Sequence, residues 1–394
     1  MKVMQIVVDF PPFAHGGSEV HVFYLTHELN KLGIQCIVIH GGATKPPIND
    51  NIKTYNRSFD LNLFRLKRIF SISILGKFKA FMPSLPFVIM KEKPDIIHVH
   101  GYSFLYTIIG GLISYIFKIP SVLTIHGMQD YSIHSSSISR ILPYIYDETL
   151  GRASLLLYNR LIAISSDVRT DIIKHGINTE KIELIPNGVD SDYYSKIPNY
   201  SLNKMEKKPF ILCVGRLEER KGFQFMIRAL PTIIKKIGSI NLIIIGADAG
   251  YGDYLKKLVK ELKLENYVRL LGYVSEDVKL QALHSAAIVV IPSIREPFGL
   301  IVLEAMAADR PVVATSAGGI VDIVKNNSAI LVPPMDSIKL ADAIIKILTN
   351  DDVKRTLIFN ARKEVERFKW SFMAKRIINL YINTSQKFYN SRML

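Results

Sequence analysis

The stretch PFILCVGRLEERKGF, residues 209–223, contains the structural unit from which this chain of 394 residues is built. Residues 209–214 are apolar throughout, which is typical of a strand buried on both faces of a covered parallel sheet. Gly215 and Arg216 end this run, and a helical pattern begins at Gly222 and Phe223. A strand followed directly by a helix predicts an α/β fold.

The same unit recurs along both halves of the chain. The first half has short β-branched runs at residues 2–9, 33–39, 95–99, 121–125, 161–164 and 182–185. The second half has such runs at residues 209–214, 240–245, 268–271, 288–291, 311–314 and 330–332. Helical patterns separate the runs, so we expect two doubly wound, Rossmann-like domains that face a central cleft.

A polar segment at residues 189–209 separates the halves; it contains two prolines and has no sustained periodicity. We therefore expect an N-terminal domain at 1–190, a linker at 191–209 and a C-terminal domain at 210–370. Residues 371–394 carry a further helical pattern, and a helix of that length is expected to cross back onto the first domain.

The composition is that of a folded protein with a basic surface. Hydrophobic residues make up 48% and charged residues 22% of the chain, which excludes a disordered polymer. The formal net charge of +15 favours anionic partners. Cys36 and Cys213 each lie in an apolar run, so no disulfide framework is expected and a cytoplasmic location is favoured.

Neither a signal peptide nor a membrane span is expected. Residues 1–10 are too few and too β-branched for a signal peptide. The apolar stretch at 102–117 falls short of the ~20 residues that span a bilayer, and Gly110 and Gly111 interrupt it. We expect it to form a buried helix between two strands.

Ligands of open α/β sheets bind beyond the carboxyl ends of the strands, so the residues after each run are informative. Arg216 follows a strand, and Lys221 lies at the start of a helix. A helix N-terminus favours anions, and an Arg beside a Lys suits a diphosphate. Either cation alone would be an ordinary surface residue, but their shared position favours a phosphate site.

The segment SIREPFGLIVLE, residues 293–304, places two carboxylates in an apolar stretch. Glu296 lies in a loop before a predicted helix, and Glu304 lies about one and a half turns into that helix. Because a buried carboxylate needs partners, we expect both to contact one ligand, with one accepting hydrogen bonds from a ribose diol.

This segment matches in full the E-x-F-G-x-x-x-x-E motif of family-4 glycosyltransferases, which the whole chain resembles. These are retaining, nucleotide-sugar-dependent enzymes with the two-domain GT-B fold. Further matching motifs are Gly16-Gly17-Ser18-Glu19, His126-Gly127, Asn187-Gly188-Val189-Asp190, Gly215-Arg216 with Lys221-Gly222, and Ala317-Gly318-Gly319. Each motif is weak alone, but each follows a predicted strand and the order is that of the family.

The resemblance implies a role for each matching residue. Arg216 and Lys221 would neutralise the donor diphosphate, as a metal ion does in other transferases, so no metal ion and no cofactor besides the nucleotide-sugar is expected. Glu304 would hold the donor ribose, Glu296 would contact the sugar, and His126 would contact it near the reacting carbon. The catalytic residues would then be His126, Glu296, Arg216 and Lys221.

Backbone groups complete the donor site that the resemblance implies. They belong to Gly16, Gly17, Phe298, Gly299 and Leu300, with the nucleotide base near Val274. One departure is the segment Gly246-Ala247-Asp248-Ala249-Gly250, where many relatives have Gly-Asp-Gly. Retention without an obvious nucleophile implies same-face substitution, in which the leaving phosphate helps to deprotonate the acceptor.

Other functions also fit parts of the sequence. His98 and His100 lie two residues apart on one strand and His126 follows another, which is the spacing of a metallohydrolase site; further candidate ligands are Asp9, His40 and Asp130. A nucleotide-sugar epimerase or a sugar phosphorylase would share the fold. An NAD-dependent oxidoreductase is disfavoured, since no Gly-x-Gly-x-x-Gly follows a strand.

Residues 57–93 combine large apolar side chains with eight cations: Arg57, Arg65, Lys67, Arg68, Lys77, Lys79, Lys91 and Lys93. This pattern fits a segment in the interface of an anionic membrane, and equally a strand and helix with a solvated basic face. The first interpretation predicts a glycan or lipid-linked acceptor and a peripheral place on the inner membrane face. Nucleic acid is not an expected partner, because no recognition motif accompanies the charge.

Overall fold

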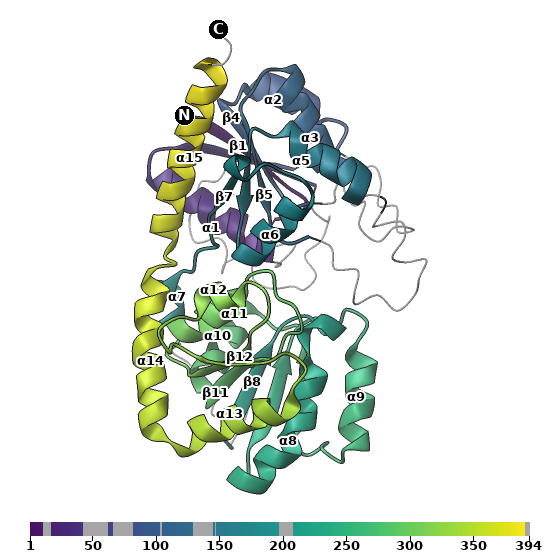
Figure 1. Ribbon diagram of the computed structural model, residues 1–394, viewed down its shortest axis with the longest axis vertical. Helices are drawn as coiled ribbons and strands as arrows, with labels where there is room; N and C mark the ends of the chain where they lie inside the picture. Colours follow the sequence, from purple (N-terminus) through teal and green to yellow (C-terminus); the bar gives the residue numbers. More distant parts are fainter. Residues whose placement is uncertain are drawn as a thin grey trace. The chain divides into compact units, whose positions relative to one another are not determined.

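The structure is a computed structural model that describes residues 1–10, 17–41, 62–65, 82–102, 105–128, 145, 147–196 and 208–390. The chain folds into two compact units, Met1–Gly188 with Trp370–Leu394 and Val189–Lys369 (Figure 1). Each unit has a parallel sheet flanked by helices, so the predicted pair of doubly wound, Rossmann-like domains is confirmed. The expected cleft between them stays a prediction.

The first unit contains a seven-stranded sheet in the order β3-β2-β1-β4-β5-β6-β7. Its strands are β1 Lys2–Val7, β2 Gln35–His40, β3 Asn62–Arg65, β4 Ile96–His100, β5 Ser121–Ile125, β6 Arg160–Ala163 and β7 Ile182–Leu184. Six of these are the predicted runs. Strand β3 was not predicted, because its four residues, NLFR, are not β-branched and lie within the basic segment 57–93.

The helices of the first unit are α1 Gly17–Lys31, α2 Leu85–Glu92, α3 Leu105–Ile116, η3 Asp147–Gly151, α5 Arg152–Leu157, α6 Ser166–Lys174, η4 Thr179–Lys181 and α15 Trp370–Asn390. They cover both faces of the sheet. On one face Val3 and Ile96 share a core with side chains of α1 and α15. On the other, Ile6 and Val99 lie against Gly110 of α3. Successive side chains of a strand point to opposite faces, which explains this division.

Helix α3 follows β4 and precedes β5, as predicted for residues 102–117, but it is not buried all round. Tyr115 and Ile116 are exposed on its outer face. The predicted helix between two strands is confirmed, and its burial is limited to one side because the helix lies on one face of a sheet. Among the described residues, no helix is both long and apolar enough to cross a membrane.

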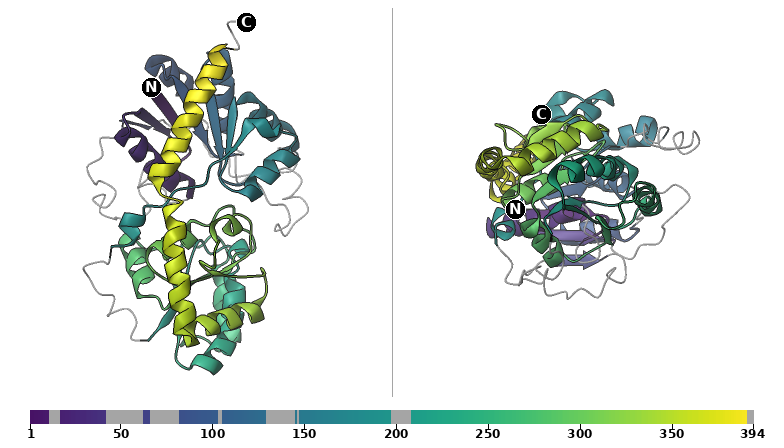
Figure 2. Two further views of the ribbon diagram at one scale, coloured as in Figure 1. Left: turned by 60° about the vertical axis from the view of Figure 1, so that its left-hand side comes forward. Right: turned by 90° about the horizontal axis from the view of Figure 1, so that it is seen from below.

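The C-terminal helix α15 packs beside α1 (Figures 1 and 2). The Tyr381 hydroxyl of α15 lies 2.5 Å from the Nδ1 atom of His98 in β4. At its start, Trp370 lies so close to Gly188 that a Cβ atom there would be 2.4 Å from the indole. The unit therefore resumes at Trp370, one residue before the predicted boundary.

The second unit contains a six-stranded sheet in the order β10-β9-β8-β11-β12-β13. Its strands are β8 Phe210–Val214, β9 Asn241–Ile245, β10 Val268–Gly272, β11 Ile288–Ile291, β12 Val312–Thr315 and β13 Ile330–Val332. Its helices are α7 Ser191–Tyr194, η6 Glu219–Lys221, α8 Phe223–Ile237, α9 Gly252–Glu261, α10 Glu276–Ser285, α11 Leu300–Ala307, α12 Ile320–Ile323, α13 Ser337–Thr349 and α14 Asp351–Glu366. All six strands correspond to predicted runs.

The predicted linker differs from the structure in part, and most of the predicted membrane segment lies outside the described residues. The expected linker at 191–209 begins with helix α7, whose Tyr194 is buried in the second unit. Residues 197–207 lie outside the described residues. Within 57–93, the described residues are 62–65, without their side chains, and 82–93, so most of the predicted membrane segment also lies outside.

Candidate active site

The carboxyl end of β8 holds the predicted phosphate-binding residues. Gly222 ends the short helix η6 with φ +70°, and a Cβ atom there would lie 1.9 Å from the carbonyl oxygen of Pro292. Only glycine fits this contact, because other side chains would meet backbone atoms that cannot yield. The close approach holds Lys221 next to the loop that follows β11.

Lys221 and Glu296 form a mostly buried ion pair at this point. The Lys221 Nζ atom donates to the Glu296 Oε2 atom over 2.6 Å, and the hydroxyl of Ser293 donates to the same oxygen over 3.2 Å. Burial by itself would raise the pKa of Glu296, but the Lys221 ammonium and these hydrogen bonds outweigh it, so the pKa lies below its ordinary value. Glu296 is therefore a carboxylate at neutral pH.

Glu304 lies in α11 and is paired with a different lysine. The Lys279 Nζ atom, in α10, donates to the Glu304 Oε2 atom over 2.9 Å and lies 2.7 Å from a Glu276 oxygen. The Tyr194 hydroxyl donates to Glu276 over 2.8 Å. Burial would lower the pKa of Lys279, but the two carboxylates raise it above its ordinary value. Lys279 is thus a fixed cation.

Lys279, Glu276 and Tyr194 were not predicted from the sequence. A lysine three residues after a glutamate in the segment EDVK is typical of an exposed helix face. The only feature of the sequence that sets Lys279 apart is its position, one turn into the helix that follows β10. Burial of this group results from packing of α7, α10 and α11, which the local pattern does not contain.

Five further predicted donor residues belong to the same unit. Arg216 has a side chain that is 62% exposed and lies 3.3 Å from Glu218. Phe298 is buried against Phe368, and Gly299 caps α11 with φ +100°. Leu300 is the first residue of α11 and Val274 lies two residues after β10. The structure thus places Lys221 and Glu296 in contact with each other, whereas Glu304 is paired with Lys279.

The segment that departs from the family pattern has a structural explanation. One oxygen of Asp248 accepts hydrogen bonds from the backbone amides of Gly250, Tyr251 and Gly252, over 2.9, 3.1 and 3.0 Å. These bonds hold the pKa of Asp248 below its ordinary value. Asp248 therefore stabilises the start of α9.

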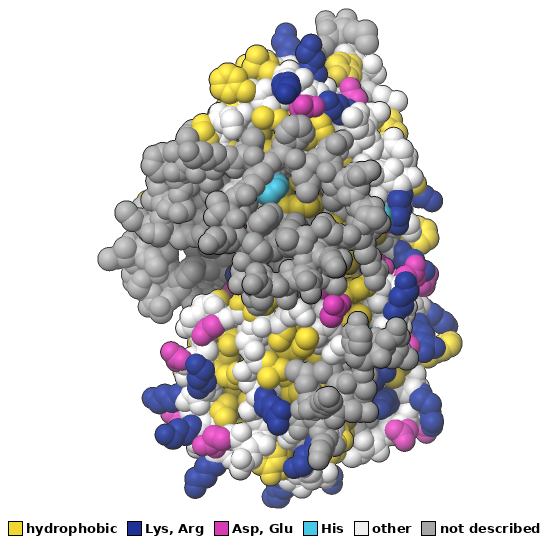
Figure 3. Space-filling model, turned by 180° about the vertical axis from the view of Figure 1, so that it is seen from behind, with side chains coloured by type: hydrophobic (Ala, Val, Ile, Leu, Met, Phe, Trp, Pro, Cys, Tyr) yellow, Lys and Arg dark blue, Asp and Glu magenta, His cyan; other side chains and the backbone are white. Residues whose placement is uncertain are grey.

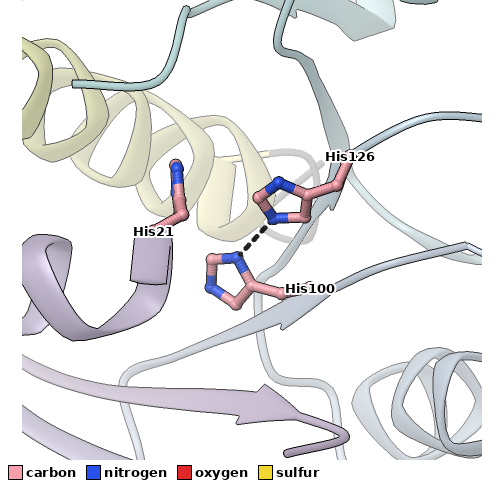
Figure 4. A group of neighbouring side chains, drawn as sticks. All are labelled: His21, His100 and His126. Atoms are coloured by element: carbon pink, nitrogen blue, oxygen red, sulfur yellow. Dashed lines mark hydrogen bonds between the residues drawn. The ribbon is translucent and has the colours of Figure 1, made fainter. Parts of the chain in front are cut away.

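The carboxyl end of the first sheet holds a cluster of histidines. His98 and His100 of β4 lie on the face that α1 and α15 cover, because they are two residues apart. His126, just after β5, lies next to His100, with 3.5 Å between Nε2 and Nδ1, and His21 of α1 completes the group (Figure 4). We call His21, His100 and His126 the histidine cluster; one ring nitrogen from each lies within 4.8 Å of the others.

Neutral amides hold two rings of the cluster. The Nδ1 atom of His21 lies 2.8 Å from Oδ1 of Asn187, and the Nε2 atom of His100 lies 2.9 Å from Oε1 of Gln5. Burial lowers the pKa of His21 to about 4, despite the Asn187 hydrogen bond, and lowers the pKa of His100 and His126 well below the ordinary value. All three rings are neutral at pH 7.

The structure separates the histidines that the metallohydrolase hypothesis had joined. Both ring nitrogens of His98 are engaged, Nδ1 with Tyr381 and Nε2 with the Thr124 hydroxyl over 2.7 Å. His98 therefore supports the core and points no free nitrogen at His100 or His126. Gly17 opens α1, the helix that carries His21, while Gly16 and Asp130 lie outside the described residues.

Two family models match this chain. The Glycosyltransferase Family 4 model matches residues 15–193, and the glycosyl transferases group 1 model matches residues 199–364. The sequence is 28% identical over 402 residues to an uncharacterised glycosyltransferase of Methanocaldococcus jannaschii, covering 97% of this chain and 98% of that protein. It is 26% identical over 376 residues to phosphatidyl-myo-inositol mannosyltransferase of Mycobacterium leprae, covering 93% and 92%.

The fold is shared with solved structures. The crystal structure of HepE from Anabaena, in complex with UDP and glucose, superposes with a TM-score of 0.77 at 23% identity, covering 97% of this chain and 100% of that one. This likeness supports the fold alone. The two family models show that the chain belongs to the group 1 and family 4 glycosyltransferases, and the likeness shows that it has the GT-B fold of two Rossmann-like domains.

Proposed function

We propose that this glycosyltransferase moves a sugar from a nucleotide-diphosphate-sugar to a glycan or lipid-linked acceptor, with retention of configuration and without a metal ion at the diphosphate. The observation that carries the proposal is the Lys221–Glu296 pair. It fixes a cation at the carboxyl end of β8, where an open α/β sheet binds its ligand.

In the proposed step, the bond between the anomeric carbon and the diphosphate oxygen breaks, and a bond to the acceptor oxygen forms on the same face. The acceptor proton passes to the departing phosphate. Lys221 stabilises the charge that develops on the diphosphate, and Arg216 is exposed enough to turn towards it. Glu296 would contact the sugar, as would His126 from the first unit.

Glu304 is proposed to bind the ribose of the donor. One of its carboxylate oxygens accepts from Lys279, which leaves the other available to a diol. Because Glu276 also neutralises Lys279, Glu304 can accept ribose hydroxyls while the lysine keeps a buried partner. The backbone around Gly299 and Val274 would then face the phosphates and the base.

The proposed acceptor class rests on the surface of the first unit. Phe87 and Met90 of α2 are 74% and 52% exposed, and Lys91 follows them. On α3, Tyr115 and Ile116 are 70% and 65% exposed. Figure 3 shows hydrophobic and basic side chains next to one another near the top of the view. Such a surface suits an anionic membrane, and the similar mycobacterial protein is named for a phosphatidylinositol substrate.

The experiment that tests this function incubates the full chain with a panel of nucleotide-sugars and lipid or glycan acceptors, with and without a chelator. We expect a product whose anomeric configuration, read by NMR, equals that of the donor, and equal rates in both conditions. An inverted product, or a rate that vanishes in chelator and returns with added magnesium ion, would contradict it. Sugar released without acceptor, or epimerised, would indicate another activity of the fold.

A further inference from the structure

Two ring nitrogens of the histidine cluster lack a partner. Within the described part of the chain, the Nε2 atom of His21 and the Nδ1 atom of His126 are buried and make no hydrogen bond. Leaving a buried polar atom without a hydrogen-bond partner destabilises a fold. The unpartnered Nε2 atom of His21 requires an explanation, and a metal ion that accepts its lone pair supplies one.

The hydrogen bonds around the cluster decide which nitrogens carry lone pairs. A carbonyl oxygen only accepts, so the Asn187 oxygen fixes the proton of His21 on Nδ1 and leaves Nε2 unprotonated. In the same way, the Gln5 oxygen fixes the proton of His100 on Nε2 and leaves Nδ1 unprotonated. The amide nitrogen of Gln5 lies 3.0 Å from the Thr26 hydroxyl, which supports this orientation of the Gln5 amide.

The lone pair of His100 Nδ1 faces the Nε2 atom of His126, and a metal ion between these rings would replace their hydrogen bond, with the His126 proton then on Nδ1. His100 Nδ1 lies 3.5 Å from His126 Nε2, and the three ligand atoms are all within 4.8 Å (Figure 4). Three nitrogens bound to one zinc ion at 2.0–2.1 Å would lie about 3.4 Å apart in tetrahedral geometry. Small side-chain rotations would bring the cluster to that spacing.

We propose that His21, His100 and His126 form a binding site for a divalent transition-metal ion of the zinc class. Neutral imidazoles suit zinc, copper and nickel, whereas magnesium and calcium prefer oxygen ligands. Asn187 and Gln5 act as the outer partners that hold metal-binding histidines in one tautomer. The site belongs to the unit without Lys221, so it is distinct from the proposed compensation of the diphosphate.

The first test uses the untagged full chain at pH 7. Zinc chloride is titrated against a chromophoric chelator, and X-ray absorption fine structure is recorded on the zinc-loaded protein. We expect one zinc ion per chain, with three imidazole nitrogens at about 2.0–2.1 Å, and no competition by excess magnesium. No stoichiometric binding, or fewer than three imidazoles around the ion, would overturn the proposal.

Variants separate the cluster from other histidines. His21→Asn and His100→Asn each remove a ligand and should weaken zinc binding by more than about 100-fold, beyond the 10–100-fold that loss of an outer partner costs. Asn187→Leu should weaken it by about 10–100-fold. His175→Asn, at the end of α6, is the control and should leave the affinity unchanged. Equal losses in the control and in His100→Asn would refute the site; if ligand variants fail to fold, the fine structure of the wild-type protein decides.

Discussion

The two sheets present contrasting groups at their carboxyl ends. At the first, the buried polar groups are neutral histidines held by amides and hydroxyls. At the second, they are ion pairs, Lys221 with Glu296 and Lys279 with Glu304. Both arrangements follow strands of the same type, so the fold does not determine the chemistry; the side chains placed at strand ends do.

The difference teaches how each end can accept a ligand. A buried lysine needs an anion, and in the second unit a carboxylate meets that need. Neutral imidazoles make no such demand, so the first unit suits hydroxyl groups or a metal ion rather than a diphosphate. The first unit also carries exposed cations, Lys91 and Lys118, at the ends of α2 and α3.

The largest expected effect on activity comes from removing the buried cation of the second unit. Lys221→Ala should lower kcat by roughly 10²–10³-fold, because a fixed donor of positive charge to the departing diphosphate is lost. The variant also leaves Glu296 buried without its cation, which should destabilise the fold by up to about 3 kcal/mol. Steady-state kinetics and urea unfolding measure the two effects.

The double variant Lys221→Ala/Glu296→Gln is the control for folding. Removing both charges should restore most of the stability while activity stays low. Near-wild-type turnover in the single variant would refute the role of Lys221. If activity recovered together with stability in the double variant, the ion pair would be structural only.

A smaller effect is expected at the second ion pair. Glu304→Gln keeps the shape of the side chain but loses its charge, so binding of the nucleotide diphosphate, measured by calorimetry, should weaken by about tenfold. Glu276→Gln is a matched control, because it removes the other carboxylate from Lys279 without touching the proposed ribose site. Equal losses in the two variants would show that Glu304 acts only by neutralising Lys279.

A vesicle-binding assay tests whether the exposed apolar and basic residues of the first unit bind an anionic membrane. Replacing Phe87 and Tyr115 with Ser should release the chain from anionic vesicles in a flotation assay, while donor binding stays intact. Binding of the wild type should weaken as salt rises, since each engaged cation contributes about 1 kcal/mol. The control is Ile338→Ser, which alters a residue of the second unit that is 76% exposed. Equal release by the control would contradict a specific surface.

The smallest expected effect is a pH dependence confined to the charged unit. The pKa of Glu296 lies below its ordinary value of 4.5, so its ionised form stabilises the fold above that pH and the contribution is lost as pH falls through the folded-state pKa. The difference in unfolding free energy between the wild type and Glu296→Gln should be constant above about pH 6 and shrink below about pH 4.5. A difference that stays constant down to about pH 3 would contradict this assignment.

The sequence by itself determined the two doubly wound domains. Strands buried on both faces are continuous apolar runs, and in this chain such runs alternate with helical patterns. It also predicted Lys221, Glu296 and Glu304 as site residues, since residues that follow a strand are placed by the local chain. Strand β3 was not predicted from the sequence, because its four residues lie within a basic segment and pairing with β2 supplies the rest of its stability.

Only the tertiary structure decided which side chains meet. Lys279 comes from α10 and Glu304 from α11, so no sequence spacing records their pairing. His21 and Asn187 are 166 residues apart, and their contact exists because α1 packs over the strand ends. A local sequence pattern reports the backbone preference of a segment and which of its faces is apolar. The partner of a buried polar group depends instead on how distant helices and strands pack, and that packing is set by the free energy of the whole chain.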